Sequence, residues 1–336
     1  MSDKPAITSS ELGVLWLTYQ EKTMILRILE HFIEKADDEK AKDIMTNLYG
    51  EINNYVGRIK DTLQNEGAVI PVGFTDQDVN KDVPKLYDNG FDIMFVRLLK
   101  EISMALHSLN ITMCYREDLV ILFKELTAIT QQYYNLCTQY LLEKGLLIKS
   151  PHVTMPKSIE FVKDNSYMGG LAINPFSEKR ALNTVEVAQI HHAIESNVFG
   201  LEMITGFAQC ANEKEVKVYF NEGVELAKGI VKELSEVFIQ GGIPVPQTPG
   251  GNATRSTIAP FSDKLMMYCV SLFCSFSMGS GSIGTAFSLR NDIPAKMAIF
   301  MKDIFEYAHK GGKIMIKNGW MEEPPQMEER KQIIKK

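Results

Sequence analysis

Apolar residues recur every three to four positions over most of the chain, which predicts long amphipathic helices. The first stretch opens with Thr8-Ser9-Ser10-Glu11, a capping-box pattern, and continues to about Ala36. The second runs from about Glu39 to Glu66 and is followed by a glycine, a common helix stop. Further helices are expected over about 91–115, 117–144, 184–210, 213–240, 262–290 and 294–318. Strand signals are weak throughout, so we expect an all-α protein.

The helical pattern occurs twice, with an offset of 174 residues. The matching pairs are Gly145 and Gly319 (319 − 145 = 174), Pro151 and Pro325, Arg116 and Arg290, and Asp118 and Asp292. A period this long corresponds to a whole domain rather than to a short structural repeat. We therefore expect a first bundle over 1–150 and a second over 183–336. The intervening strap, 151–182, is expected to lie on the bundles, because Ile159, Phe161, Val162 and Tyr167 do not suit a free linker.

The lengths of the connections predict how each half is wound. Each half has short connections after its first and third helices and a long one, roughly 20 residues, after its second. One long crossover in a four-helix bundle is typical of ferritin-like folds. The expected fold is therefore two tandem ferritin-like four-helix bundles.

Composition narrows the class of protein. Apolar residues at 45% and charged residues at 23% are ordinary for a globular chain. A net charge of −6 gives no basic surface, so nucleic acid is not expected as a partner. The first residues lack the apolar core of a signal peptide, which favours a cytoplasmic location. Five cysteines without a Cys-x-x-Cys spacing indicate reduced core residues.

The segment 265–289 contains no charged residue, which raises the question of a membrane span. Its many serines and glycines favour instead a helix buried in the bundle or in a dimer. Gly279, Gly281 and Gly284 would let another backbone approach closely. The same glycines match G-x-G-x-x-G, but helical residues on both sides argue against a dinucleotide site.

Several acidic residues and one histidine are candidates for a metal site. They are Glu21, Glu51, Glu195, Glu225, His191 and Glu202. Glu21 and Glu195, and Glu51 and Glu225, are partners in the repeat, and His191, Glu195 and Glu202 share one helical stripe. The alternative is an ion-pair network with nearby lysines. Glu306 and His309 form the one Glu-x-x-His of the chain, and Glu306 is expected to face water, so a full di-metal set is missing.

Three segments carry a resemblance to a known family. They are 260–267 (Pro-Phe-Ser-Asp-Lys-Leu-Met-Met), 314–326 (Ile-Met-Ile-Lys-Asn-Gly-Trp through Pro-Pro-Gln) and 70–76 (Ile-Pro-Val-Gly-Phe-Thr-Asp). The chain resembles an uncharacterised family of spore-forming bacteria, labelled a domain of unknown function and sometimes called spore coat proteins. The resemblance implies tandem ferritin-like bundles and no catalytic residues.

Two function hypotheses follow from the sequence. The first is a non-enzymatic structural or interaction protein of a spore-forming cell, cytoplasmic or spore-associated, that self-associates or binds protein partners. The second is a bundle that binds a metal or a small apolar ligand, with redox chemistry as an extension. No cofactor is favoured, and iron or manganese would fit the second hypothesis.

Overall fold

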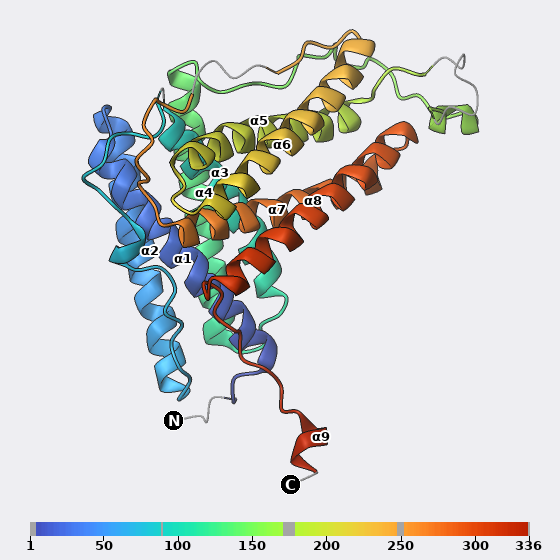
Figure 1. Ribbon diagram of the computed structural model, residues 1–336. Helices are drawn as coiled ribbons and strands as arrows, with labels where there is room; N and C mark the ends of the chain where they lie inside the picture. Colours follow the sequence, from blue (N-terminus) through green and yellow to red (C-terminus); the bar gives the residue numbers. More distant parts are fainter. Residues whose placement is uncertain (1–4, 89, 171–178, 247–251, 335–336) are drawn as a thin grey trace.

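The computed structural model describes residues 5–88, 90–170, 179–246 and 252–334 (Figure 1). The first repeat folds into α1 (Ser9–Lys35), α2 (Glu39–Asn65), α3 (Phe91–Ile111) and α4 (Glu117–Glu143). The second folds into α5 (Thr184–Cys210), α6 (Lys214–Gln240), α7 (Asp263–Phe287) and α8 (Asp292–Lys317), followed by the short α9 (Arg330–Ile333). The expected all-α fold of two tandem four-helix bundles is confirmed. The ferritin-like label and the domain limits stay predictions.

At one end of each bundle, the glutamate of the first capping box connects the first helix to the fourth. Thr8 N donates to Glu11 Oε2 at 2.9 Å, and Glu11 N donates back to Thr8 Oγ1 at 3.3 Å. Glu11 Oε1 also accepts the backbone N–H of Arg116 at 2.8 Å. The Arg116 guanidinium binds Asp118 at 2.8 Å and also pairs with Glu66. The repeated Arg and Asp residues therefore tie the start of α1 to the start of α4.

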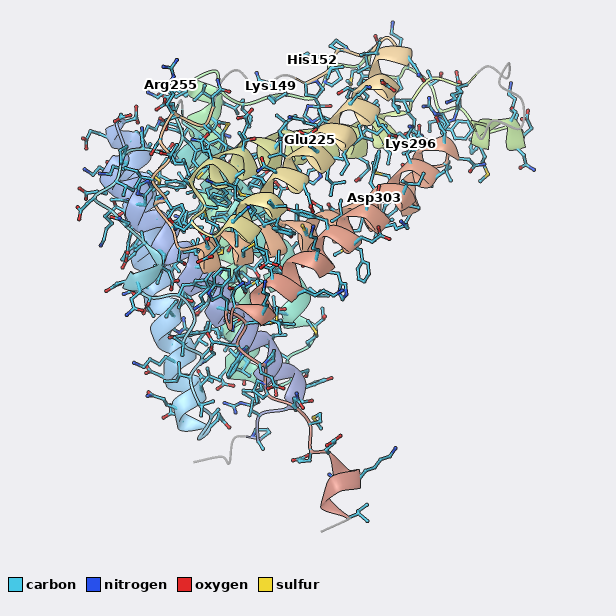
Figure 2. The ribbon with its side chains drawn as sticks, viewed as in Figure 1. Lys149, His152, Glu225, Arg255, Lys296 and Asp303 are labelled. Atoms are coloured by element: carbon cyan, nitrogen blue, oxygen red, sulfur yellow. The ribbon has the colours of Figure 1, made fainter. Side chains whose placement is uncertain are left out.

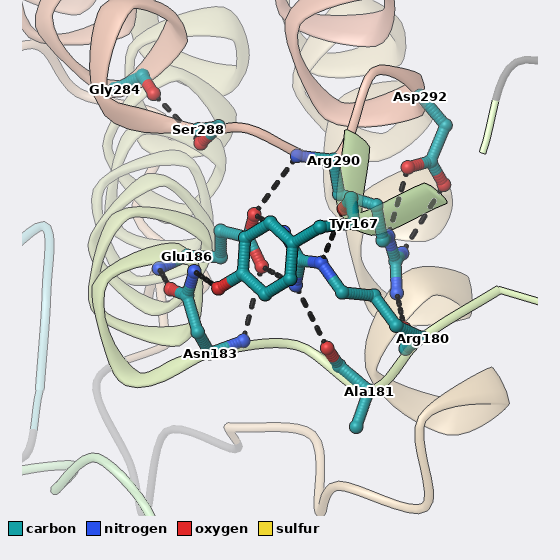
Figure 3. Close-up of polar contacts among 9 residues, drawn as sticks. All are labelled: Tyr167, Arg180, Ala181, Asn183, Glu186, Gly284, Ser288, Arg290 and Asp292. Atoms are coloured by element: carbon teal, nitrogen blue, oxygen red, sulfur yellow. Dashed lines mark hydrogen bonds and ion pairs between the residues drawn. The ribbon is translucent and has the colours of Figure 1, made fainter. Parts of the chain in front are cut away.

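The second bundle repeats this tie and uses it to hold the end of the strap (Figure 3). Glu186 Oε1 accepts the backbone N–H of Arg290 at 3.0 Å, and Arg290 Nε donates to Asp292 Oδ1 at 2.9 Å. Arg180, at the end of the strap, donates to both carboxylate oxygens of Glu186, at 2.6 and 2.8 Å. Its guanidinium lies over the ring of Tyr167 at 3.9 Å. The strap is thus fastened by polar contacts.

Within the described part of the strap, three of the apolar side chains expected to pack on the bundles are exposed, whereas Leu182 at its end packs against the core. Ile159 is 88% exposed and Phe161 84% exposed, and Val162 is also exposed. The expectation is therefore wrong for these three side chains. Tyr167, the fourth, is half-buried, and the Arg180 guanidinium lies over its ring.

The long crossovers of the two repeats lie side by side. Val79 pairs with Phe261 in an isolated antiparallel bridge, and Asn80 N donates to Pro260 O at 2.8 Å. A second bridge joins Tyr87 and Ala253. Among the described residues, β-type pairing is limited to these two isolated bridges. They connect the two repeats through backbone hydrogen bonds.

An aromatic cluster joins the bundles at their crossing point. Phe91 of α3 stacks on Phe199 of α5 with ring centroids 4.6 Å apart, and Phe95 lies 5.9 Å from Phe273 of α7. Tyr87 packs so closely on α5 that a Cβ at Gly206 would lie 2.5 Å from its ring. One buried apolar cluster contains residues of both repeats. The bundles therefore share a core, in which burial of each large side chain contributes about 1.5–3 kcal/mol.

The five cysteines are buried free thiols, as the sequence predicts: Cys114, Cys137, Cys210, Cys269 and Cys274. Burial is the main cause that raises the pKa of each thiol, for example that of Cys137 to about 12. These side chains are therefore protonated core residues near neutral pH.

Candidate functional site

A cluster of buried polar side chains lies between α1 and α3, inside the first bundle. It consists of Glu21, Lys22, Lys100, Ser103 and His107, each at most 2% exposed. Ser103 Oγ donates to Glu21 Oε1, and Lys22 Nζ donates to Ser103 Oγ at 3.2 Å. Lys22 Nζ also lies 3.2 Å from Glu21 Oε2. The glutamate is thus neutralised inside the bundle by its neighbour in sequence.

Burial also disfavours the charged forms of Lys100 and His107. Burial, with Lys22 as a second cause, lowers the pKa of Lys100 to about 7. The pKa of His107 falls well below its usual value, mainly because of burial. Neither ring nitrogen of His107 has a hydrogen-bond partner among the described residues. A neutral amine and imidazole could accept protons, but none of the cluster's side chains lines a cavity described below.

The repeat-equivalent positions of the second bundle keep the glutamate and the serine and carry smaller, uncharged residues at the other three. Glu195, Ser196, Cys274, Ser277 and Gly281 stand in place of the first bundle's cluster (for example 195 − 21 = 174). Two adjoining cavities of about 40 and 60 Å³, both lined by Ser196 and Ser277, lie among α5–α8. Such volumes hold a few water molecules rather than a larger ligand.

Glu195 points out of its bundle and belongs to a polar seam between the repeats. Arg97 Nη1 of α3 donates to Glu195 Oε1 at 3.0 Å, and Arg97 Nη2 donates to Tyr134 Oη at 2.7 Å. One turn away, His192 pairs with Glu101. The hydrogen bond with Glu101 raises the pKa of His192. This seam connects α3 of the first bundle with α5 of the second.

The candidate metal residues do not converge. Glu51 is exposed on α2, and Glu225, labelled on α6 in Figure 2, has a side chain 72% exposed and pairs with Lys228 at 2.8 Å. His191 is buried, with no partner for its Nε2 among the described residues. Burial raises the pKa of Glu202. Within the described ranges no group of three or more His, Cys, Asp or Glu side chains could hold a metal ion.

Glu306 and His309 lie on the solvent face of α8, as predicted for Glu306. Glu306 pairs with Lys302 at 2.9 Å with its side chain 61% exposed, and the ring of His309 stacks on Phe305. The Glu-x-x-His spacing is therefore part of a solvated helix face.

Helix α7 differs from the expectation of a helix surrounded by protein. Among the described helices, α7 alone is long and apolar enough to cross a bilayer, judged by length and composition only. However, 33% of its most apolar 18-residue window is buried inside the protein, and the rest is not. Its first half, to Cys274, is largely buried, whereas its second half exposes one face. This face consists of Ser275, Gly279, Ser282 and Ala286, at spacings of four, three and four residues.

Apolar side chains border this small-residue face. Ile283 and Phe287 of α7 and Phe305 of α8 are each more than half exposed. We call the four small residues and these three side chains the α7 face. The glycines of α7 do not meet the expectation of close backbone approach. A Cβ at Gly279 would meet nothing within 4 Å, whereas a Cβ at Gly281 or Gly284 would meet a side chain, Met301 at 3.5 Å and Gln189 at 3.2 Å.

Sequence reasoning missed Lys100 and Ser103 in the buried cluster. Lys100 lies four residues after Val96 and three before Ser103, on the apolar stripe of α3. A lysine at the helical spacing of the buried residues of α3 was the signal that could have revealed the cluster. The G-x-G-x-x-G segment, in contrast, lies inside α7 with helix on both sides, as predicted.

Comparisons with known proteins agree with the repeat. Among curated proteins no sequence matches the chain. One solved structure, a "putative spore coat protein" from Bacillus halodurans C-125, is similar at 17% identity with a TM-score of 0.43. The similarity covers 45% of this chain and 98% of that one. A family model described as a protein of unknown function (DUF3231) matches residues 1–159 and 172–333, one match for each repeat. The expected resemblance is thereby confirmed, and the chain belongs to the DUF3231 family.

Proposed function

We propose that this chain is a non-enzymatic interaction protein that self-associates through the α7 face. The observation that carries the proposal is that α7, from Leu265 to Phe287, has no charged residue although its second half is exposed. Ordinary solvent-facing helix surfaces carry charges, as α8 does with Lys296 and Asp303 (Figure 2). An uncharged exposed face with apolar borders is typical of an interaction site.

The repeat relates one edge of the α7 face to a contact between the bundles. Ser275 of α7 corresponds to Glu101 of α3 (275 − 174 = 101). Glu101 pairs with His192 of the other bundle, whereas Ser275 is exposed. The α3 counterparts of the other three small residues, Ala105, Ser108 and Thr112, are exposed as on α7.

A symmetric dimer suits the chemistry of the face. In a two-fold interface each surface meets its own copy, so an uncharged face meets an uncharged face and no charge is desolvated. Small residues at Gly279 and Ser282 let two helices approach closely. The borders at Ile283, Phe287 and Phe305 then add apolar burial, at about 25 cal/mol per Å².

Sedimentation velocity over a range of concentrations tests the proposal with two matched glycine variants. Gly279→Glu places a charge on the α7 face, whereas Gly229→Glu places one on the exposed side of α6. A Cβ meets nothing within 4 Å at either position, so neither change disturbs the monomer. We expect wild type and Gly229→Glu to form dimers and Gly279→Glu to stay monomeric. A wild type that is monomeric at all concentrations contradicts the proposal.

The same variants distinguish protein from membrane as the partner of α7. If wild type stays monomeric but sediments with phospholipid vesicles, and Gly279→Glu does not, the face binds membrane and the self-association proposal is wrong.

Association with the spore is the second part of the proposal, and it rests on the family resemblance. It predicts that the protein is enriched in purified spores of a sporulating host over vegetative cytoplasm. Quantitative immunoblotting of the two fractions tests this. Equal amounts per total protein in both fractions would contradict a spore role and leave self-association standing.

A further inference from the structure

The contact between the bundles has two repeat-equivalent seams. In the first, α3 meets α5, and in the second, α1 meets α7. A cavity lies in each. The first is lined by Met94, Arg97, Leu141, Leu146, Leu147 and Ile148, together with residues of α5. The second is lined by Tyr268, Ser271, Met315, Trp320, Met321 and Glu322, the same positions shifted by 174.

The first seam is filled by an ion pair. Arg97 donates to Glu195 at 3.0 Å, to Tyr134 at 2.7 Å and to Thr138 at 3.1 Å. Its long side chain occupies the space between α3 and α5, and the remaining cavity has a volume of about 40 Å³. Such a volume takes a few water molecules.

The second seam does not contain the equivalent ion pair. Ser271 stands in place of Arg97, and Glu21, the counterpart of Glu195, turns into the first bundle toward Ser103 and Lys22. The cavity that results has a volume of about 170 Å³. The replacement of one arginine by serine therefore opens a pocket that only the paired repeats can form.

Aromatic rings form much of its wall. The ring of Tyr268 lies 5.1 Å from that of Phe74, and Trp320 lines the same pocket. Lys264 Nζ donates to Gly73 O at 2.7 Å and lies over the Phe74 ring, so its charge is already engaged. The side chains of Gln20 and Ser271 and the hydroxyl of Tyr268 make no hydrogen bond to another described residue. These three side chains are polar groups of the pocket lining that are open to a ligand.

The outer wall is anchored. Glu322 accepts the backbone N–H of Val72 at 2.8 Å and of Gly73 at 2.7 Å, which fixes the segment after α8 against the crossover of the first repeat. Leu17 is 55% exposed and Met321 49% exposed, so the pocket opens to solvent between them.

The geometry points to a binding site for a small, uncharged aromatic molecule with one hydrogen-bonding substituent, in the second seam. A dry apolar cavity of about 150 Å³ takes up benzene, so the 170 Å³ pocket suits a single substituted ring. The ring would lie among Phe74, Tyr268 and Trp320, and its polar group would reach Tyr268 Oη or Gln20. This inference is independent of self-association, because the pocket residues and the α7 face do not overlap.

Phenol is a suitable probe, because Trp320 reports on the pocket directly. Trp16→Phe removes the other tryptophan of the chain, and emission excited at the red edge of the tryptophan band then follows Trp320 alone. We expect a saturable change with phenol, confirmed by calorimetry on the wild type. Tyr268→Phe should weaken phenol binding by about fivefold, as for the loss of one neutral hydrogen bond, and leave benzene binding unchanged.

Ser271→Arg restores the residue of the first seam and should fill the pocket. The equivalent site accommodates Arg97, so the fold is expected to persist, which circular dichroism checks. Phenol binding should then be lost, while the control Gly229→Arg on α6 should bind as wild type does. Unchanged binding by a folded Ser271→Arg, or no saturable phenol signal in wild type, would overturn the proposal. Cyclohexanol binding as tight as phenol binding would overturn the aromatic class.

Discussion

Two tyrosines and two glycines interlock α6 with α8, and replacing one glycine should destabilise the protein. Tyr219 and Tyr307 stack with ring centroids 4.2 Å apart and planes 2° from parallel. Tyr219 lies against Gly311 of α8, and Tyr307 lies against Gly223 of α6. A Cβ at Gly311 would lie 2.8 Å from Tyr219 Cζ. The Gly311→Ala variant tests whether this contact holds the two helices in register.

The magnitude follows from two opposing effects. Alanine is favoured over glycine inside a helix by about 1 kcal/mol. Against this, Tyr219 would have to retreat by at least 0.6 Å to reach an ordinary contact (3.4 − 2.8 = 0.6). Its ring cannot retreat freely, because it is 1% exposed and stacked on Tyr307. Overpacking of this kind costs about 1–3 kcal/mol, so the net loss should be about 1 kcal/mol.

The adjacent Gly312 is a matched control on the same helix. A Cβ there meets nothing within 4 Å, so Gly312→Ala should gain up to about 1 kcal/mol from helix propensity alone. Urea unfolding, followed by circular dichroism and fluorescence together, measures both variants. We expect them to differ by about 2 kcal/mol in unfolding free energy.

A double-mutant cycle then assigns the loss to the tyrosine. Tyr219→Phe removes the hydroxyl, so it should restore part of the stability of Gly311→Ala, with a coupling of about 1 kcal/mol. Equal stabilities of Gly311→Ala and Gly312→Ala would refute the reasoning. So would a coupling energy of zero.

Two further predictions concern the bundle interiors. Burial lowers the pKa of Lys100 to about 7. Above that pH the unfolded chain binds more protons than the folded one, so the free energy of unfolding rises with pH. Relative to Lys100→Met, wild type should gain up to about 1.4 kcal/mol per pH unit between pH 7 and 9 in urea unfolding, and a pH-independent difference would contradict this. On α7, Gly284→Leu should lose about 1–3 kcal/mol against Gln189, whereas Gly279→Leu should not, and equal melting temperatures would show that Gly284 is not closely packed. From the sequence we expect Gly251 to lie in an exposed loop, where a leucine has room, so it would be a further control, but it lies outside the described residues.

The candidate sites were less predictable than the fold, because they depend on which neighbour a side chain meets. Glu21 and Glu195 occupy equivalent positions and carry the same group. Ser103 and Lys22 draw Glu21 into its bundle, whereas Arg97 draws Glu195 outward. The sequence marked both as candidates but could not separate their roles. Comparing Arg97 with Ser271 across the repeat would have indicated the second seam.

The sequence by itself determined the helices, their caps and the duplication. Helical periodicity and capping boxes such as Thr8 with Glu11 act over a few residues, so their outcome does not depend on the rest of the chain. Tertiary structure decided the exposure of Phe161 and of the α7 face. It also decided that the first seam holds an ion pair and the second a pocket. These depend on residues distant in sequence that pack together, and the same helical pattern is compatible with a buried or an exposed position until its partner is known.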